Sequence, residues 1–157
     1  MKRYVKLLLP AFVISCMPVA CSSSPKFADV INRDWNLAEV RLQNETVVFE
    51  REKLAEEGFN EIFTLRFDDE RVNGVGAPNR YFAPYTVTDK QGITINTIAG
   101  TLMASIREPE KLKEHSYFGY LQNVTRWNLV KGNLELYSRG DDGTEAVLVY
   151  VPAGTGK

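Results

Sequence analysis

Short runs of alternating apolar and polar residues recur along the chain and are separated by turn-forming residues. In the clearest run, Phe63, Leu65 and Phe67 alternate with Thr64 and Arg66. A period of two predicts strands with one face buried and the other in water. Because tight turns join most of the runs, they indicate an antiparallel sheet that curls toward a barrel. The expected strands and apolar segments cover residues 34–42, 46–49, 62–67, 81–88, 93–95, 98–104, 126–129, 134–137 and 146–151.

One longer segment has the pattern of a helix. Its apolar residues Tyr117, Phe118, Leu121 and Val124 fall largely at spacings of three and four, and Pro109 suits a first helical turn. We therefore expect one amphipathic helix over residues 109–123, with its aromatic side packed on the sheet. A shorter helix is expected on the surface within the charged stretch 50–58. The predicted fold class is mainly β (α+β), a small antiparallel barrel-like sheet with one amphipathic helix packed on it.

The first twenty residues follow a different pattern. Lys2, Arg3 and Lys6 precede a mostly apolar stretch over residues 7–20 that is too short for a bilayer span of roughly 20 residues. This is typical of a signal peptide. Cys21 then follows a small residue and precedes a serine-rich segment, which resembles the lipidation site of a bacterial lipoprotein.

Two alternatives to Cys21 remain open. Cys16 also follows a lipoprotein-like sequence, although it leaves a shorter hydrophobic region, and a plain secretory signal is the third possibility. Our division of the chain is a lipoprotein signal peptide over 1–20, a lipidated N-terminus and tether over 21–33, and one globular domain over 34–152. The expected location is the bacterial cell envelope, on a membrane-anchored lipoprotein that is periplasmic or surface-exposed.

Charge and residue counts exclude several classes of function. A net charge of −1 argues against nucleic acid as the main partner. His115 is the only histidine, and processing at Cys21 would leave the domain without a free thiol. We therefore expect no cofactor, no metal centre built from histidine or cysteine, and no cysteine nucleophile.

The segment 74–85 contains the highest density of special residues. Its glycines permit a positive φ and its prolines fix φ, while Asn79, Arg80 and Tyr81 bring an amide, a guanidinium and a ring together. Asn79 and Arg80 are therefore a candidate binding pair. In the alternative interpretation, Asn79 fixes the loop through backbone hydrogen bonds, and Arg80 caps it or stacks on Tyr81 or Tyr85.

Other residues suggest chemistry that a structural explanation covers equally well. His115 could pair with Ser105 or Ser116 in a hydrolase, but no Gly-x-Ser-x-Gly motif accompanies them. Turns would keep the grouped carboxylates solvated, whether as an acid–base pair or a calcium site. Aromatic residues could line a barrel cavity or fill a core. The carboxylates are Asp68, Asp69, Glu70, Asp141 and Asp142, and the aromatic residues are Trp35, Tyr117, Phe118, Tyr120 and Trp127.

Four segments together resemble the META-domain family, the group of HslJ-like heat-shock lipoproteins. They are Trp-Asn-Leu at 35–37, the stretch 67–85 with Asn-Arg-Tyr-Phe, the segment 98–104 with Thr-Leu-Met-Ala, and Leu-Gln-Asn-Val-Thr-Arg at 121–126. The resemblance spans residues 35–151. It implies a small barrel-like domain that is often lipid-anchored or periplasmic, linked to envelope stress and not known for catalysis. Many relatives carry a pair of cysteines where this chain has Pro78 and Ser105, so a disulfide or redox role of that pair cannot operate here.

These observations together predict a lipid-anchored envelope protein that is not an enzyme and has a binding or structural role in envelope stress tolerance. Its partners would be the membrane, through the N-terminal lipid, and an envelope protein or a small apolar ligand. A barrel that binds a small apolar ligand in the periplasm is the alternative, and a hydrolase is a third hypothesis.

Overall fold

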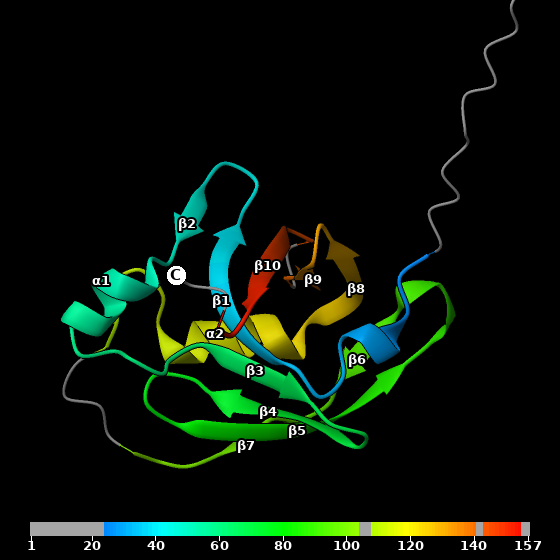
Figure 1. Cartoon of the computed structure of the whole chain (residues 1–157), viewed down its shortest axis with the longest axis horizontal. Helices are drawn as coiled ribbons and strands as arrows, with labels where there is room; N and C mark the ends of the chain where they lie inside the picture. The colour runs from blue at the N-terminus through cyan, green and yellow to red at the C-terminus, as the bar shows by residue number, and fades with distance from the viewer. Residues whose placement is uncertain (1–23, 104–107, 141–142, 155–157) are drawn as a thin grey trace, which may run out of the picture.

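Within residues 24–103, 108–140 and 143–154, which the computed structural model describes, ten strands form one antiparallel sheet (Figure 1). Its order is β6-β5-β4-β3-β1-β10-β9-β8, with β2 added beside β1 and β7 beside β5. A bridge between Gly92 and Arg126 and a 2.8 Å hydrogen bond from Gln91 to Asn128 bring the two ends together. The predicted barrel-like sheet is therefore confirmed, nearly closed on itself. The strands are β1 (Asp34–Arg41), β2 (Thr46–Val48), β3 (Thr64–Phe67), β4 (Arg71–Val75), β5 (Arg80–Val87), β6 (Ile93–Ile95), β7 (Ala99–Gly100), β8 (Val124–Val130), β9 (Asn133–Arg139) and β10 (Glu145–Pro152).

The core lies inside the curled sheet and receives one face of helix α2 (Glu114–Gln122). Tyr117 of α2 is fully buried, and its ring lies 5.0 Å from that of Phe63 and 6.0 Å from that of Tyr81. Its hydroxyl also receives a hydrogen bond from Tyr150 of β10. Because Tyr81 of β5 and Tyr150 of β10 lie on opposite sides of the barrel, α2 packs between them, as Figure 1 shows. The predicted packing of an aromatic helix face on the sheet is confirmed.

Strand β1 changes its neighbour halfway along its length. Its first half pairs with β3 and its second half with β2, and a register shift falls between Leu37 and Glu39. Arg51, the first residue of α1 (Arg51–Glu56), lies at this split. Its guanidinium donates to the carbonyl oxygens of Leu37 and Ile62, each at 2.7 Å, and to that of Phe63 at 3.5 Å. The short helix expected within 50–58 therefore exists, and it satisfies carbonyls that the split leaves open.

Two predicted segments, the amphipathic helix and the apolar segment 98–104, have wrong boundaries. Helix α2 begins at Glu114 and not at residue 109, because Lys113 is extended and the side chains of Pro109 and Leu112 turn into the protein. The apolar segment 98–104 contributes only β7 to the sheet; residue 104 lies outside the described residues.

The packed domain also begins earlier than the predicted tether allows. Phe27–Asp29 forms a 3-10 turn, η1, and Val30 is fully buried. The ring of Phe27 contacts the rings of Phe67, Tyr85 and Trp127 at 5.0–5.6 Å. Apolar residues at 27, 30 and 31 give this turn one face to bury, which a tether lacks. Within the tether predicted for 21–33, residues 27–31 are thus part of the fold.

Residues 1–23, including Cys16 and Cys21, lie outside the described part of the chain. Among the described helices, none has both the length and the apolar character needed to cross a bilayer.

Candidate functional site

The loop between β4 and β5 is shaped by close approach to its neighbours and not by left-handed backbone. Gly74 belongs to β4, and neither Gly74 nor Gly76 has a positive φ, which corrects the expectation for this segment. A Cβ on Gly76 would lie 2.5 Å from Oε1 of Glu114 and 2.8 Å from Cζ of Phe118. A Cβ on Gly74 would collide with the carbonyl oxygen of Thr64. Both glycines are therefore needed for their small size.

Glu114 organises this loop from the start of α2. Its Oε1 accepts the backbone N–H of Ala77 at 2.5 Å and that of Asn79 at 2.7 Å. Its Oε2 accepts an N–H of the Asn79 side chain at 2.6 Å. One half-buried carboxylate thus gathers three donors from a four-residue turn that contains the cis Ala77–Pro78 bond. Hydrogen bonds to a carboxylate are among the stronger ones in proteins.

Asn79 joins the same cluster to the segment after β7. It is 8% exposed, and its Oδ1 accepts the hydroxyl of Thr101 at 2.8 Å and the N–H of Met103 at 2.7 Å. Its Nδ2 also lies 3.3 Å from the carbonyl of Met103. Both ends of the amide are occupied by the protein itself. These hydrogen bonds favour the structural interpretation of Asn79 over the binding one.

Tyr81 lies in the interior, on the opposite face of β5 from Arg80. Its hydroxyl donates to the carbonyl of Thr64 at 2.9 Å and lies 3.2 Å from the hydroxyl of Tyr117. Tyr150 donates to the same Tyr117 hydroxyl at 3.2 Å. Burial raises the pKa of Tyr117 to about 12. Burial, and after it the neighbouring tyrosines, also raises the pKa values of Tyr81 and Tyr150 well above the usual value of tyrosine. These three hydroxyls form a buried cross-link and not a binding surface.

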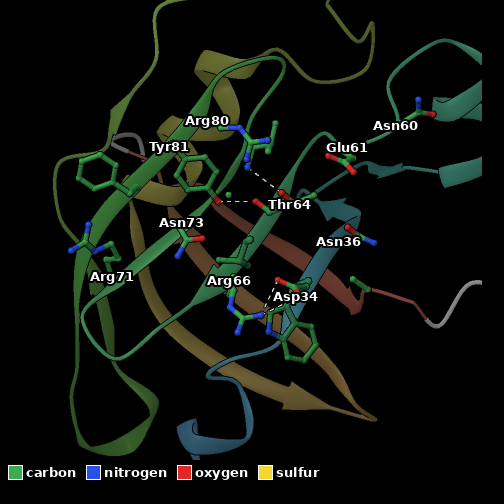
Figure 2. Close-up of a pocket in the computed structure, with 16 residues that line it drawn as sticks. Asp34, Asn36, Asn60, Glu61, Thr64, Arg66, Arg71, Asn73, Arg80 and Tyr81 are labelled. Atoms are coloured by element: carbon green, nitrogen blue, oxygen red, sulfur yellow. Dashed lines mark hydrogen bonds and ion pairs between the residues drawn. The ribbon is translucent and has the colours of Figure 1, made fainter.

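Arg80 is the residue of the predicted trio that faces solvent. Residues at odd spacings along a strand point to opposite faces, so Arg80 lies on the other face of β5 from Tyr81 and Tyr85 and cannot stack on them. This corrects the stacking part of the alternative interpretation. Thr101 fixes the backbone of Arg80 with two hydrogen bonds. The N–H of Arg80 donates to the hydroxyl of Thr101 at 3.2 Å, and the N–H of Thr101 donates to the carbonyl of Arg80 at 3.0 Å. The side chain of Arg80 lines two adjoining surface grooves of about 740 and 620 Å³. Figure 2 shows it above Thr64 on the outer face of the sheet.

The larger groove crosses the outer faces of β1, β3, β4 and β5 (Figure 2). One row of residues runs directly across the strands, because Asp34 pairs with Arg66, Arg66 with Asn73, and Asn73 with Phe82. Sequence reasoning placed several of these residues on strands. It did not bring them together, because the pairing of β1 with β3 is not written in the local pattern.

The other candidate residues are placed in ordinary structural roles or fall outside the described residues. His115 is exposed, and its Nε2 lies 3.3 Å from the hydroxyl of its chain neighbour Ser116. Asp68 accepts the N–H groups of Glu70 and Arg71 in a tight turn, and these bonds lower its pKa. No cluster of metal-ligating side chains is found among the described residues. Ser105, Asp141 and Asp142 lie outside them.

The aromatic residues proposed for a ligand cavity pack mainly against one another and their neighbours. Trp35 and Tyr117 are fully buried, and Trp127 is 3% exposed with its ring 5.0 Å from that of Phe27. Phe118 contacts both Tyr117 and Tyr81. This packing favours the core interpretation of these rings.

Sequence reasoning missed Glu114, Thr101 and Arg51 as organising residues. The helix was expected to begin at residue 109, so Glu114 fell in its interior and nothing in the pattern marked it as the residue that holds a loop. The partners of Glu114 lie 35 and 37 residues away in the chain, so no local pattern connects them.

The fold and the loop define a small, nearly closed antiparallel barrel with one helix packed inside its curve. The sequence model of the META domain matches residues 28–151. The chain belongs to the META domain family, as the resemblance predicted.

Comparison with solved structures shows the same fold in distant sequences. The NMR structure of a protein from Burkholderia xenovorans has a TM-score of 0.60 at 18% identity, covering 93% of this chain and 99% of that one. The crystal structure of a DUF4847 family protein from Bacteroides vulgatus has a TM-score of 0.55 at 11% identity, covering 80% and 95%. Identities this low establish similarity of fold alone. No curated protein matches the chain.

Proposed function

We propose that this chain is a lipid-anchored protein of the bacterial envelope, whose META domain has a binding or structural role in envelope stress tolerance and is not an enzyme. The observation that carries the proposal is the order of segments at the N-terminus. A basic start, a short apolar stretch and Cys21 precede the first packed residue, Phe27. Cleavage before Cys21 would leave the whole packed domain in the mature chain.

The arrangement of the loop supports a role without catalysis. Asn79 and Glu114 use their polar atoms to hold the loop, and His115 is exposed beside Ser116. A role in stress tolerance is supported by membership of the META family together with the lipoprotein-like signal. The envelope location follows from the same signal.

Metabolic labelling with a radioactive fatty acid tests the anchor. We expect the wild-type chain and Cys16→Ser to incorporate label and to sediment with membranes, and Cys21→Ser to do neither. Loss of label in Cys16→Ser alone would move the lipidation site to Cys16. An unlabelled wild-type chain would contradict the anchor altogether.

The physiological role needs a separate experiment. A strain that lacks the chain should lose viability under heat or envelope-damaging agents, and the wild-type gene should restore it. Cys21→Ser should restore it less well if anchoring is required. Equal survival of the deletion strain and its parent would contradict a role in stress tolerance.

A further inference from the structure

The outer groove that contains Arg80 has a polar lining that the fold itself leaves partly unused. It lies on the face of β1, β3, β4 and β5 opposite the core, with a volume of about 740 Å³. At one end, the carboxylate oxygens of Asp34 both lie 3.1 Å from a guanidinium nitrogen of Arg66. Arg71 lies 5.6 Å over the ring of Phe82 and 3.6 Å from the carboxylate of Glu70. These groups already have partners within the chain.

The other end of the groove is different. Asn36, Asn60, Glu61 and Arg80 line it, and their side chains make no hydrogen bond or ion pair with another described residue. Figure 2 shows Arg80, Glu61 and Asn36 near Thr64 and Asn60 farther out, all on the side of the groove away from Arg71. This end of the groove therefore offers a bound molecule two amides, one carboxylate and one guanidinium as hydrogen-bonding partners.

Arg80 projects from a backbone that is unusually well fixed. Thr101 bonds to both its N–H and its carbonyl, and the preceding Asn79 is held by Glu114. A charged group on a rigid element loses little freedom when it binds, so it contributes more affinity than one on a mobile loop.

The backbone of the groove floor indicates what kind of molecule it suits. The ladders β1–β3, β3–β4 and β4–β5 use the backbone groups of these strands, so an extended peptide cannot add to them as a further strand. The polar side chains that line the groove, amides, a hydroxyl and charged groups, match the many hydroxyls of a sugar chain. Phe82, 47% exposed, offers an apolar surface in the same groove for the face of a sugar ring.

The pairing of charged side chains in the groove limits the class of ligand further. The lining carries three guanidinium groups, on Arg66, Arg71 and Arg80, and two carboxylates, on Asp34 and Glu61. A third carboxylate, on Glu70, lies 3.6 Å from Arg71. Asp34 neutralises Arg66, whereas Arg80 has no carboxylate within ion-pair distance among the described residues. A ligand that brings its own carboxylate to Arg80 complements this arrangement.

We propose that this groove binds an acidic oligosaccharide, with Arg80 pairing with a carboxylate of the ligand and Asn36, Asn60 and Glu61 bonding to its hydroxyl groups. The proposal rests on the binding role proposed above and gives that role a class of ligand. It does not depend on the lipid anchor, so the labelling experiment and a binding experiment can fail separately.

The test is calorimetric titration of the full-length chain, purified in detergent, with trigalacturonate, triacetylchitotriose and trialanine. We expect trigalacturonate to bind, and the neutral sugar to bind at least about tenfold more weakly, because a charge-assisted pair contributes about that factor. Arg80→Gln should weaken trigalacturonate binding about tenfold. Because the Arg80 side chain has no described partner, the variant should keep the wild-type thermal midpoint.

Arg139→Gln is the matched control, since it removes an equal charge from an exposed residue outside the groove. It should bind like the wild type. Asn36→Ala should weaken trigalacturonate binding while leaving the fold intact, and it tests a second residue of the same groove. No binding of trigalacturonate, equal binding by wild type and Arg80→Gln, or tighter binding of trialanine would each overturn the proposal. Equal losses in Arg80→Gln and Arg139→Gln would also overturn it, because they would indicate attraction by net charge alone.

Discussion

At the scale of single residues, the loop that first suggested a binding site is explained by one carboxylate. Glu114 accepts three N–H groups from Ala77 and Asn79, and Asn79 passes the connection on to Thr101 and Met103. Each hydrogen bond to a charged group contributes about 1.5–3 kcal/mol, and a donor left without its acceptor costs a similar amount. The loop is therefore held by a residue that sequence analysis assigned only to a helix.

Glu114→Gln should lower the free energy of unfolding by about 2–3 kcal/mol, because the amide weakens bonds to three donors and turns its own N–H₂ toward one of them. Urea unfolding followed by circular dichroism measures the change. Glu110→Gln, an exposed residue just before the helix, is the control and should change stability by less than about 0.5 kcal/mol. Equal midpoints for the two variants would contradict this role of Glu114.

At the scale of elements, the helix α1 completes the sheet at the place where β1 changes its neighbour. The guanidinium of Arg51 bonds to carbonyls on β1 and on the residues before β3. Burial lowers the pKa of Arg51, which shows that its position is costly for a charge. Unpaired buried carbonyls would also be costly, so the arginine and the split depend on each other.

Arg51→Lys should therefore destabilise the protein although it keeps the positive charge. A single ammonium cannot reproduce the planar fork that reaches Leu37 and Ile62 together, and we expect a loss of about 2–3 kcal/mol. The reverse exchange, Lys53→Arg, is the control, because Lys53 is exposed in the same helix and pairs with the exposed Glu50. Thermal and urea midpoints measure both. A wild-type midpoint for Arg51→Lys would show that the fork is dispensable.

The elements also show how far the sequence predicts this fold. Strands such as β3 were predictable because alternation maps directly onto burial, and Phe63, Leu65 and Phe67 are all in the core. Boundaries were less predictable where a side chain bonds to a distant segment, as Glu114 does at the start of α2. Arg51 was read as part of a charged surface helix, since nothing local reveals that its partners are backbone carbonyls elsewhere in the chain.

The candidate site was predicted in part for the same reason. The sequence identified Asn79, Arg80 and Tyr81 as unusual, and the alternation along β5 determines which of them faces out. It could not reveal that Asn79 is fully bonded, because its partners Thr101, Met103 and Glu114 come from other elements. The groove beside Arg80 depends on the order of four strands, which is a property of the fold.

At the scale of the whole molecule, three tyrosine hydroxyls connect the two sides of the barrel through the helix between them. Tyr81 belongs to β5, Tyr117 to α2 and Tyr150 to β10, and all three are buried. Burial raises each pKa, to about 12 for Tyr117, whereas unfolded tyrosine has a pKa of 10.0. The folded state therefore keeps protons that the unfolded chain releases in alkaline solution.

The sign of the pH dependence follows from this difference. The contribution of these tyrosines to stability is complete below pH 10 and is lost as pH rises above 10, through a pKa of about 12 for Tyr117. Three protons give a slope of about 4 kcal/mol per pH unit in this window. Urea unfolding at several alkaline pH values measures the slope, and Tyr150→Phe should reduce it by about a third. A flat stability across the window, with tyrosinate absorbance rising in the folded state, would contradict buried hydroxyls.

The packing of Phe27 limits how far the domain can move from its point of attachment. Only residues 22–26 separate Cys21 from Phe27, and an extended chain gains at most about 3.3–3.6 Å per residue. If Cys21 carries the lipid, the barrel cannot rise more than about 20 Å above the bilayer. Such a protein samples a thin layer next to the membrane, so its search for a ligand is nearly two-dimensional, and only molecules present in that layer can reach its outer groove.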